Sequence, residues 1–571
     1  MRAISASCDC ARSGHAVTES SPRASRLTPE AAALLAVLLA FYLAFHSRNI
    51  LAIDGNHRAF EVWQRQALFF HGNGHLLYPV NVLLWTGMLR ALGFRLESPF
   101  AFFAAVTWMN ALAAVVALAV FYLLVVCVTE HRGVSLVATA ALGVSNCFLT
   151  QAVNGNEPMV GFAWAMLALY AAVGSRPGRR TALAGLLLSG ILFALSMATY
   201  RSMVLLAPAA LLAVWFSWSG RRSIAALALI LGALSATAAI YGSAYWLEGK
   251  RSLLAALAAF ASEEGARGFL RLTPGKLLEV PLGLTSSIFP LLRFQPFNGM
   301  RGILHGSATR LFWLGILPLL ICAVLAASLA ATWRLRPWMA RRQRLAWMAA
   351  TAGLLFTWLP AILWDPTYSK LLMQPLACIV FLCALGMSVA SRRRKARRLW
   401  WAGALTWLAA ACATLPVAVR DHSRGTPWLG QTARLAAMVG PEDFVVGGWD
   451  PVSTLYSSLW VEHQPDSSHP YVSVLDSNAH FLSFPSEAAM HGEAAVDILR
   501  AAIVSTRQRH GRVYFIGLLD LPRSDWEALL GRSFGVPYGS VATLRSHSRI
   551  VLELSEAGSV EPVRLLLDDE H

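Results

Sequence analysis

Long apolar runs separated by short polar segments are the main pattern along this chain. Most of the runs have about 17–25 residues, the length that an α-helix needs to cross the hydrocarbon core of a bilayer. Of the 571 residues, 56% are hydrophobic and 14% are charged, whereas roughly a quarter of the residues in a soluble domain are charged. The pattern predicts a polytopic α-helical membrane protein with about eleven transmembrane helices. The predicted spans are 31–50, 99–128, 134–151, 158–175, 181–199, 202–219, 223–246, 310–333, 345–364, 371–390 and 399–419.

Basic residues gather in every second segment between these runs, as expected when those segments face the cytoplasm. The same rule places the N-terminus in the cytoplasm and the C-terminal region outside the cell inner (plasma) membrane. The net charge of +16 therefore reflects topology and does not indicate a nucleic-acid partner. The basic clusters are Arg132, Arg176 to Arg180, Arg221 and Arg222, Arg334 to Arg344, and "SRRRKARR" at 391–398.

Composition divides the chain into three parts. A Ser- and Arg-rich tail is expected to be disordered and cytoplasmic. A helical membrane domain starts where Thr28 and Pro29 provide a helix cap and a first turn. A small domain without cysteines follows on the outer side, so no disulfide framework is expected there. The boundaries are 1–27 for the tail, 28–419 for the membrane domain with outer loops 51–98 and 247–309, and 420–571 for the outer domain.

Two segments of the outer loops are predicted to be helices that do not cross the membrane. The segment 75–94 is nearly long enough to span, but counting it would place the later basic clusters outside. It is therefore interpreted as an interfacial or re-entrant helix on the outer face. The stretch "LEGKRSLLAALAAFASEEGARGFLRL" is interpreted as an amphipathic helix lying on the membrane.

The outer domain has the alternation of strands and helices that is typical of a small α/β fold. The stretches "DFVVGGWD" and "GRVYFIGLLDL" are predicted to be short buried strands, and "RIVLELSE" a last strand. Helices are predicted for "PVSTLYSSLW" and "DWEALLGRSF". The glycine spacing of "VGGWDP" does not match a dinucleotide-binding loop.

No Asp, Glu, Lys or Arg lies in the interior of a predicted span. A charged side chain at the bilayer centre costs roughly 2.5–3.5 kcal/mol. Ion-coupled transporters usually accept that cost because they need a binding site at the midplane. In this chain the ionisable residues collect at the outer ends of the runs, which favours chemistry on a lipid-linked headgroup at the outer surface.

The first outer loop carries the most specific motif. Asp54 follows the first run directly, and "GNGHLLYPVNVLLW" comes about twenty residues later. These residues resemble the first outer loop of GT-C glycosyltransferases that use polyprenyl-phosphate sugars, in particular the protein O-mannosyltransferase-like branch. The resemblance implies that Asp54 is the catalytic base. It implies contacts with the substrate for four further residues of the loop: His57, Glu61, His75 and Tyr78.

The second and third outer loops add further candidates, and the second of them resembles the same family. The stretch "TQAVNGNEPMVGFAWAMLALY" places Glu157 at the start of the fourth span, where the family has an acidic residue near the donor or a bound divalent ion. A helix-capping carboxylate favoured by the helix dipole is the alternative for Glu157. Arg201 in "MATYRSMVLLAP" has no acidic neighbour and suits a phosphate; the alternative is a side chain that snorkels to the interface.

The loop "LPAILWDPTYSKLLMQP" resembles the aromatic outer loop near the end of GT-C membrane domains. Tyr368 and Lys370 are candidates for contact with the lipid phosphate or sugar, and Asp365 for capping the tenth helix beside them. An interfacial anchor of Trp, Tyr and Lys is the alternative. Arg293 is a weaker candidate for the phosphate.

The residues and the resemblance together indicate transfer of a sugar from a polyprenyl-phosphate donor to an acceptor hydroxyl of a protein, lipid or glycan. Asp54 would remove the hydroxyl proton, cations would stabilise the leaving phosphate, and displacement would invert the anomeric centre. Carboxylates suit Mg²⁺ or Mn²⁺, but no ligand spacing requires a metal. The alternatives are a transporter or flippase of lipid-linked sugars and a non-catalytic membrane scaffold.

Overall fold

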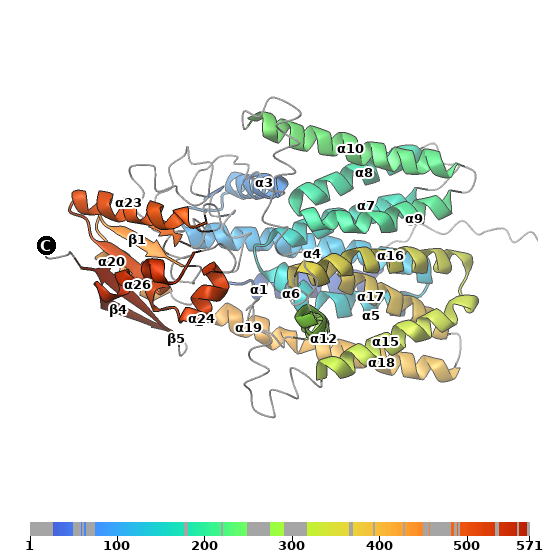
Figure 1. Cartoon of the computed structure of the whole chain (residues 1–571). Helices are drawn as coiled ribbons and strands as arrows, with labels where there is room; N and C mark the ends of the chain where they lie inside the picture. The colour runs from blue at the N-terminus through green and yellow to red at the C-terminus, as the bar shows by residue number, and fades with distance from the viewer. Residues whose placement is uncertain are drawn as a thin grey trace, which may run out of the picture.

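The chain folds into a helical bundle with a smaller sheet domain at one end (Figure 1). The computed structural model describes residues 27–48, 59, 62–63, 75–175, 181–218, 221–247, 274–289, 317–364, 369–391, 394–425, 429–448, 456, 481–484, 488, 492–531, 536–556 and 559–567. The long bundle helices are α1 (Pro29–Ala44), α4 (Pro99–Thr129), α7 (Glu157–Gly174), α8 (Ala182–Thr199), α10 (Arg222–Leu247), α15 (Leu317–Leu335), α16 (Arg341–Trp364), α17 (Ser369–Ala390) and α18 (Arg394–Cys412). Shorter elements of this part are α3 (Leu77–Ala91), α5 (Arg132–Gly143), α6 (Asn146–Val153), η1 (Arg201–Leu206), α9 (Ala207–Ser217), α12 (Pro274–Ile288), η4 (Arg336–Trp338) and α19 (Thr414–Arg424).

This is a multi-pass membrane protein. Among the described residues, seven helices are long and apolar enough to cross a membrane, and an eighth span results if the bent pair α5 and α6 counts as one. Each of the eleven predicted runs contains at least one described helix. The helix start predicted at Thr28 is confirmed, because its side chain accepts a hydrogen bond from the backbone N–H of Ala31.

The run at 134–151 is not the continuous span that was predicted. It consists of α5 and α6, which meet at an angle of 65°. The break leaves backbone carbonyls without helical partners, and hydroxyl groups from distant helices satisfy them. Tyr42 of α1 donates to the carbonyl of Gly143 at 2.7 Å, and Thr414 of α19 donates to that of Val144 at 2.5 Å. Buried irregular backbone is stable in a membrane when its polar groups find such partners.

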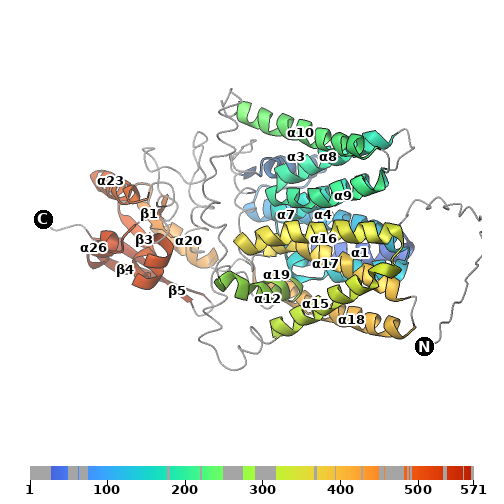
Figure 2. The same cartoon turned by 45° about the vertical axis from the view of Figure 1, so that its right-hand side comes forward.

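A group of helix starts with basic residues lies at the end of the bundle remote from the sheet domain. Helices α5, α10, α16 and α18 all begin there, each with an arginine (Figure 1). Helix α17 runs through the middle of the bundle (Figure 2), and 89% of its apolar 18-residue stretch is buried. Helix α17 begins at the end of the bundle nearer to the sheet domain (Figure 2). The site described below lies at this end.

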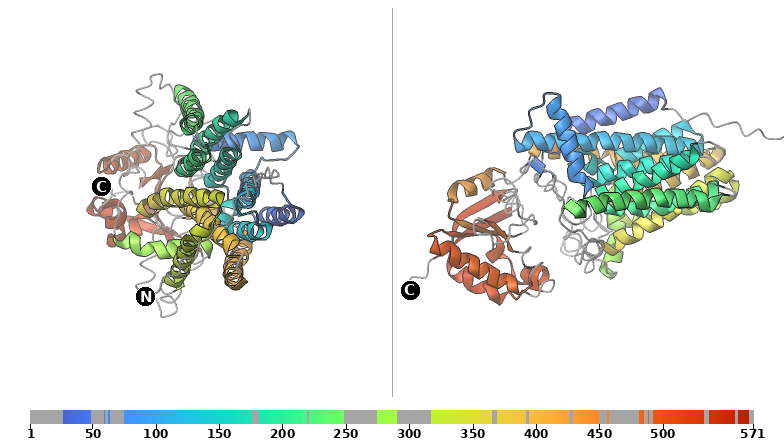
Figure 3. Two further views of the ribbon diagram at one scale, coloured as in Figure 1. Left: turned by 90° about the vertical axis from the view of Figure 1, so that its right-hand side faces the viewer. Right: turned by 90° about the horizontal axis from the view of Figure 1, so that it is seen from above.

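Helix α3 lies across the direction of the bundle helices at the end next to the sheet domain (Figure 3). This agrees with the prediction of a helix that does not span. One face of α3 is buried against α4 through Tyr78, Val82 and Leu89, and the opposite face exposes Leu84 and Met88. The amphipathic helix predicted after residue 247 and the tail 1–26 lie outside the described residues.

The sheet domain, which belongs to the C-terminal region 420–571, is a five-stranded mixed sheet with the order β2-β1-β3-β5-β4. Its three parallel strands pack α23 and α24 on one face and α20 on the other, and alternate residues such as Val445 and Val446 enter the two cores. Phe103 of α4 belongs to one of these cores, so the domain is seated on the bundle. The elements are α20 (Leu429–Met438), β1 (Phe444–Gly447), β2 (Phe481–Ser483), α23 (Ala494–Gln508), β3 (Val513–Ile516), η5 (Leu518–Asp520), α24 (Arg523–Trp526), η6 (Glu527–Gly531), α26 (Gly539–Ser546), β4 (Ser548–Glu556) and β5 (Ser559–Leu566).

The predicted strands β1, β3 and β4 are confirmed, and the helix predicted over "DWEALLGRSF" forms as α24 followed by a π-helical turn. The prediction that β4 is the last strand is wrong, because β5 follows and pairs with both β3 and β4. Of the helix predicted over "PVSTLYSSLW", only Tyr456 is described, in a helical conformation.

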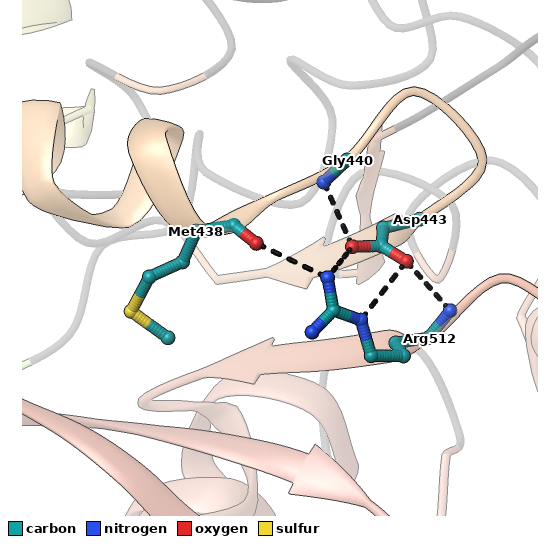
Figure 4. Close-up of polar contacts among 4 residues, drawn as sticks. All are labelled: Met438, Gly440, Asp443 and Arg512. Atoms are coloured by element: carbon teal, nitrogen blue, oxygen red, sulfur yellow. Dashed lines mark hydrogen bonds and ion pairs between the residues drawn. The ribbon is translucent and has the colours of Figure 1, made fainter.

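An ion pair closes the turn that leads into β1 (Figure 4). Asp443 accepts hydrogen bonds from the backbone N–H groups of Gly440 and Arg512 and from the Arg512 guanidinium, at 2.8 to 3.3 Å. Burial raises the pKa of Asp443, but these donors and the charge of Arg512 outweigh it and hold the pKa below its usual range. The contacts tie the start of β1 to β3 and so fix the parallel register.

Candidate functional site

The candidate site lies where α7, η1 and α17 begin, at the bundle end next to the sheet domain. Five of the predicted site residues belong to the described part of the chain and gather on these elements and on the neighbouring start of α3. They are His75, Tyr78, Glu157, Arg201 and Lys370. The other six lie outside the described residues: Asp54, His57, Glu61, Arg293, Asp365 and Tyr368.

A buried ion pair joins the first turns of α7 and α17. The Nζ atom of Lys370 lies 3.5 Å from Oε1 of Glu157, and each side chain is 1% exposed. The alternative interpretation of Lys370 as an interfacial anchor is therefore wrong, because an anchor keeps its charge in contact with water. Removing one partner of a buried ion pair typically costs about 3–5 kcal/mol, since the other charge is left unpaired.

The helix dipole has opposite effects on the two partners of the ion pair. Glu157 is the first residue of α7, where the partial positive charge of a helix N-terminus favours a carboxylate. Lys370 occupies the same kind of position in α17, where that partial charge opposes an ammonium group. The dipole thus explains Glu157 on its own, as the capping alternative predicted, but it does not explain Lys370.

Two residues that the sequence analysis did not identify link η1 to α17. Gln374, one turn after Lys370, donates from Nε2 to the hydroxyl of Ser202 at 3.0 Å and contacts the sulfur of Met203 at 3.1 Å. Arg201 precedes these residues in η1 and is half-buried. The hydrogen bond therefore holds the turn that carries Arg201 against the turn that carries Lys370.

Helix α7 approaches η1 so closely that only glycine fits at position 161. A Cβ atom there would lie 2.9 Å from Cβ of Tyr200 and 3.3 Å from Cγ of Met203. The hydroxyl of Ser196 donates to the carbonyl of Gly161 at 2.7 Å and fastens α8 to the same point. Gly161 lies one turn after Glu157, so this contact sets the spacing between the acidic residue and η1.

The loop before Glu157 is held by side chains from α3 and α4. The hydroxyl of Tyr78 donates to the carbonyl of Gly155, and Nδ2 of Asn110 donates to the carbonyls of Asn154 and Asn156 at 2.6 Å each. Tyr78 and Asn110 are both fully buried. Tyr78 thus contacts the loop that positions Glu157, and its predicted contact with the substrate stays a prediction.

The chain on either side of Asp54 is anchored near the same loop. The backbone N–H of Ser47 donates to the carbonyl of Val153 at 2.7 Å. On the other side, Ala59 is buried in the cluster that contains Tyr78 and Val160, and Val160 lies in the first turn of α7. Asp54 itself lies outside the described residues, and its role as the base stays a prediction.

His75 is held at the end of α8. Its ring stacks on Tyr200 with 5.3 Å between ring centroids, and Nδ1 donates to the carbonyl of Thr199 at 3.2 Å. This places His75 beside the residue that precedes Arg201. Within the described residues, no group of three or more His, Cys, Asp or Glu side chains is arranged to hold a metal ion. The charge of Glu157 is already balanced by Lys370.

Comparison with known proteins gives a match at the level of the fold. No protein-family model and no curated protein sequence matches the chain. The crystal structure of ArnT from Cupriavidus metallidurans in the apo state superposes with a TM-score of 0.53 and 11% sequence identity, covering 94% of this chain and 97% of that one. The fold is that of ArnT. The same protein bound to undecaprenyl phosphate gives a TM-score of 0.52 at 10% identity, covering 95% and 99% of the two chains.

The match confirms the predicted fold class, a helical membrane bundle with a small C-terminal α/β domain, because both parts of the structure take part in it. The match extends over nearly the whole chain, so it includes the sheet domain as well as the bundle. The finer resemblance to the protein O-mannosyltransferase-like branch stays a prediction.

Proposed function

We propose that this protein is a membrane glycosyltransferase that moves a sugar from a polyprenyl-phosphate donor to an acceptor hydroxyl on the extracytoplasmic face. One observation carries the proposal: Glu157, Lys370 and the Arg201 turn converge at one end of a bundle with the ArnT fold. A structure of ArnT holds undecaprenyl phosphate, which is a lipid phosphate of the proposed kind. A buried lysine and a half-buried arginine suit the phosphate of such a carrier.

The proposed mechanism needs a base for the acceptor hydroxyl and cations for the donor phosphate. An acceptor hydroxyl is a weak nucleophile until a base takes its proton, and Asp54 is the proposed base. The C–O bond between the sugar and the phosphate breaks as the acceptor oxygen attacks, and negative charge collects on the phosphate. Arg201 and Lys370 are the described cations that would stabilise this charge. Attack from the face opposite to the phosphate inverts the anomeric centre.

Other parts of the proposal rest on the sequence. The sugar is a hexose or pentose, with a mannose-like sugar the first to test, and the acceptor is a protein, lipid or glycan. His57, His75 and Glu61 are proposed substrate contacts, as are Arg293, Asp365 and Tyr368. A Mg²⁺ or Mn²⁺ ion is proposed only as an additive to test. The outer domain would help to select the acceptor.

The proposed function is tested with purified protein in lipid vesicles that contain polyprenyl-phosphate sugars. We expect covalent transfer of the sugar to an added acceptor fraction, detected by mass spectrometry. Asp54→Asn should lose transfer while it inserts and unfolds like the wild type, because asparagine cannot take up the proton. Asp497→Asn is the matched control, since Asp497 is an 81% exposed side chain of the sheet domain. Movement of the lipid-linked sugar across the vesicle without covalent transfer would favour a transporter.

The proposed orientation has an independent test. We propose an inner-membrane protein whose N-terminus and basic helix starts, such as Arg132 and Arg394, face the cytoplasm. Reporter fusions that end near residue 54 should then be active outside the cytoplasm, and those that end near residue 393 inside it. The opposite result at residue 54 would remove the base from the proposed reaction face.

A further inference from the structure

The Glu157–Lys370 pair is poorly explained as a device for stability. Replacing a buried ion pair by apolar residues is often neutral or stabilising, because the pair must offset the desolvation of both charges. The dipole of α17 also opposes Lys370 where it stands. A lysine in this position therefore needs an anion beside it, and in the described structure that anion is Glu157.

The charges around the pair are unequal. The N-termini of α7 and α17 each contribute partial positive charge, and Arg201 begins η1, which α17 contacts. Glu157 is the only carboxylate among the described first-turn residues of these three elements. Among the described first-turn residues of α7, η1 and α17, positive charge therefore outweighs the one carboxylate, which is an arrangement suited to binding a second anion.

Asn156 supplies an independent sign that something else binds here. It precedes Glu157, is fully buried, and neither atom of its side-chain amide is hydrogen-bonded within the described part of the chain. An unsatisfied buried amide is costly and calls for a partner such as a ligand oxygen or an ordered water. A phosphate next to Lys370 would bring oxygen atoms that accept hydrogen bonds to this end of α7.

We propose that Glu157 acts as an internal competitor for the phosphate of the lipid carrier and that Lys370 exchanges Glu157 for that phosphate when the carrier binds. Lys370 should bind the phosphate more strongly than it binds Glu157, because a phosphate offers more charge and more acceptor oxygens than one carboxylate. Glu157 is not left without compensation, because the N-terminus of α7 still stabilises its charge. The inference rests on the proposed function only for the identity of the phosphate ligand.

The exchange predicts opposite effects for the two partners on the binding of a carrier that has no sugar. In Glu157→Gln the competing charge is gone, so undecaprenyl phosphate should bind about three- to tenfold more tightly, where tenfold corresponds to about 1.4 kcal/mol. In Lys370→Met it should bind about tenfold more weakly. The double variant should bind like Lys370→Met, because the competitor matters only while the lysine is present.

The double variant also serves as the control for folding. Each single change removes one member of a buried ion pair and is expected to lower the melting temperature, whereas the double variant removes both charges and should recover most of the loss. A purely structural pair would give the same affinity for undecaprenyl phosphate in the wild type and in the double variant. Weaker binding in both single variants would also overturn the exchange, because it requires tighter binding in Glu157→Gln.

Binding is measured by microscale thermophoresis in detergent with undecaprenyl phosphate and, in parallel, with inorganic phosphate. The predicted order of affinities with either probe supports the exchange, and the probe that binds more tightly shows whether the lipid or the free anion is the natural ligand. Equal affinities among the four proteins, in a preparation that still transfers sugar, would refute the exchange alone. The predicted order in a preparation that transfers no sugar would support the exchange and refute the proposed function.

Discussion

Replacing Gly161 by alanine should reduce sugar transfer through a small displacement of η1. The added Cβ atom would lie 2.9 Å from Cβ of Tyr200, and ordinary contact begins at about 3.4 Å, so α7 and η1 must separate by roughly half an ångström. Overpacking of this kind costs about 1–3 kcal/mol, while alanine in a helix is favoured over glycine by about 1 kcal/mol. The net loss of unfolding free energy should therefore be about 0–2 kcal/mol, too little to unfold the protein.

The effect on activity should be larger than the effect on stability. An error of about 1 Å in the position of catalytic groups can lower a rate by 10²-fold, so half of that displacement at the Arg201 turn should lower transfer about tenfold. The control is Gly174→Ala at the far end of the same helix, where the added Cβ atom has no neighbour within 4 Å. Both variants are compared by transfer rate and by melting temperature. Equal transfer rates in the two variants would falsify the claim that the Gly161 contact positions the site.

Two further predictions concern the bundle and the outer domain. Gly190→Ala and Gly232→Ala should each lower the melting temperature, because the new Cβ atoms would meet backbone atoms of the facing helix at 2.1 and 2.3 Å. Gly242→Ala on α10 is the control, because its Cβ atom would enter open space and should leave the melting temperature unchanged. The acid stability of the sheet domain should depend on Asp443, because folding lowers the pKa of this carboxyl group. The stability that this shift provides is complete above the unfolded pKa of roughly 3.9, and it is lost as the pH falls from there through the folded pKa. Asp443→Asn should therefore reduce the acid dependence of hydrogen exchange in β1 and β3, and an unchanged dependence would mean that other carboxyl groups cause it.

The order and positions of the helices could be predicted because bilayer thickness constrains the length of each apolar run. The break between α5 and α6 could not, since the hydroxyl groups of Tyr42 and Thr414 that make it stable come from distant parts of the chain. An apolar run reports that a segment is buried, but it does not report whether another helix supplies partners for an open backbone carbonyl.

The strand β5 was missed for a different reason. Its sequence "SVEPVRLL" contains Pro562, which cannot donate to a ladder and argues against an inner strand. The structure accommodates it because the pairing of β3 with β5 ends at Ile516 and Val563. The carbonyl of Pro562 still accepts from the N–H of Gly517, so the missing donor falls just beyond the ladder.

The residue types of the site could be predicted more readily than their pairing. Gln374 offered a signal, because a polar residue inside an apolar run needs a partner, and Lys370 lies one turn earlier on the same face. That argument requires a polar element opposite this face of α17, but several outer helix ends carry suitable groups. The choice of Glu157 and Ser202 depends on how closely α7, η1 and α17 approach one another, and Gly161 permits that approach. The ionic chemistry of the site therefore comes from residues that are recognisable one by one, while its geometry depends on a glycine that has no chemistry of its own.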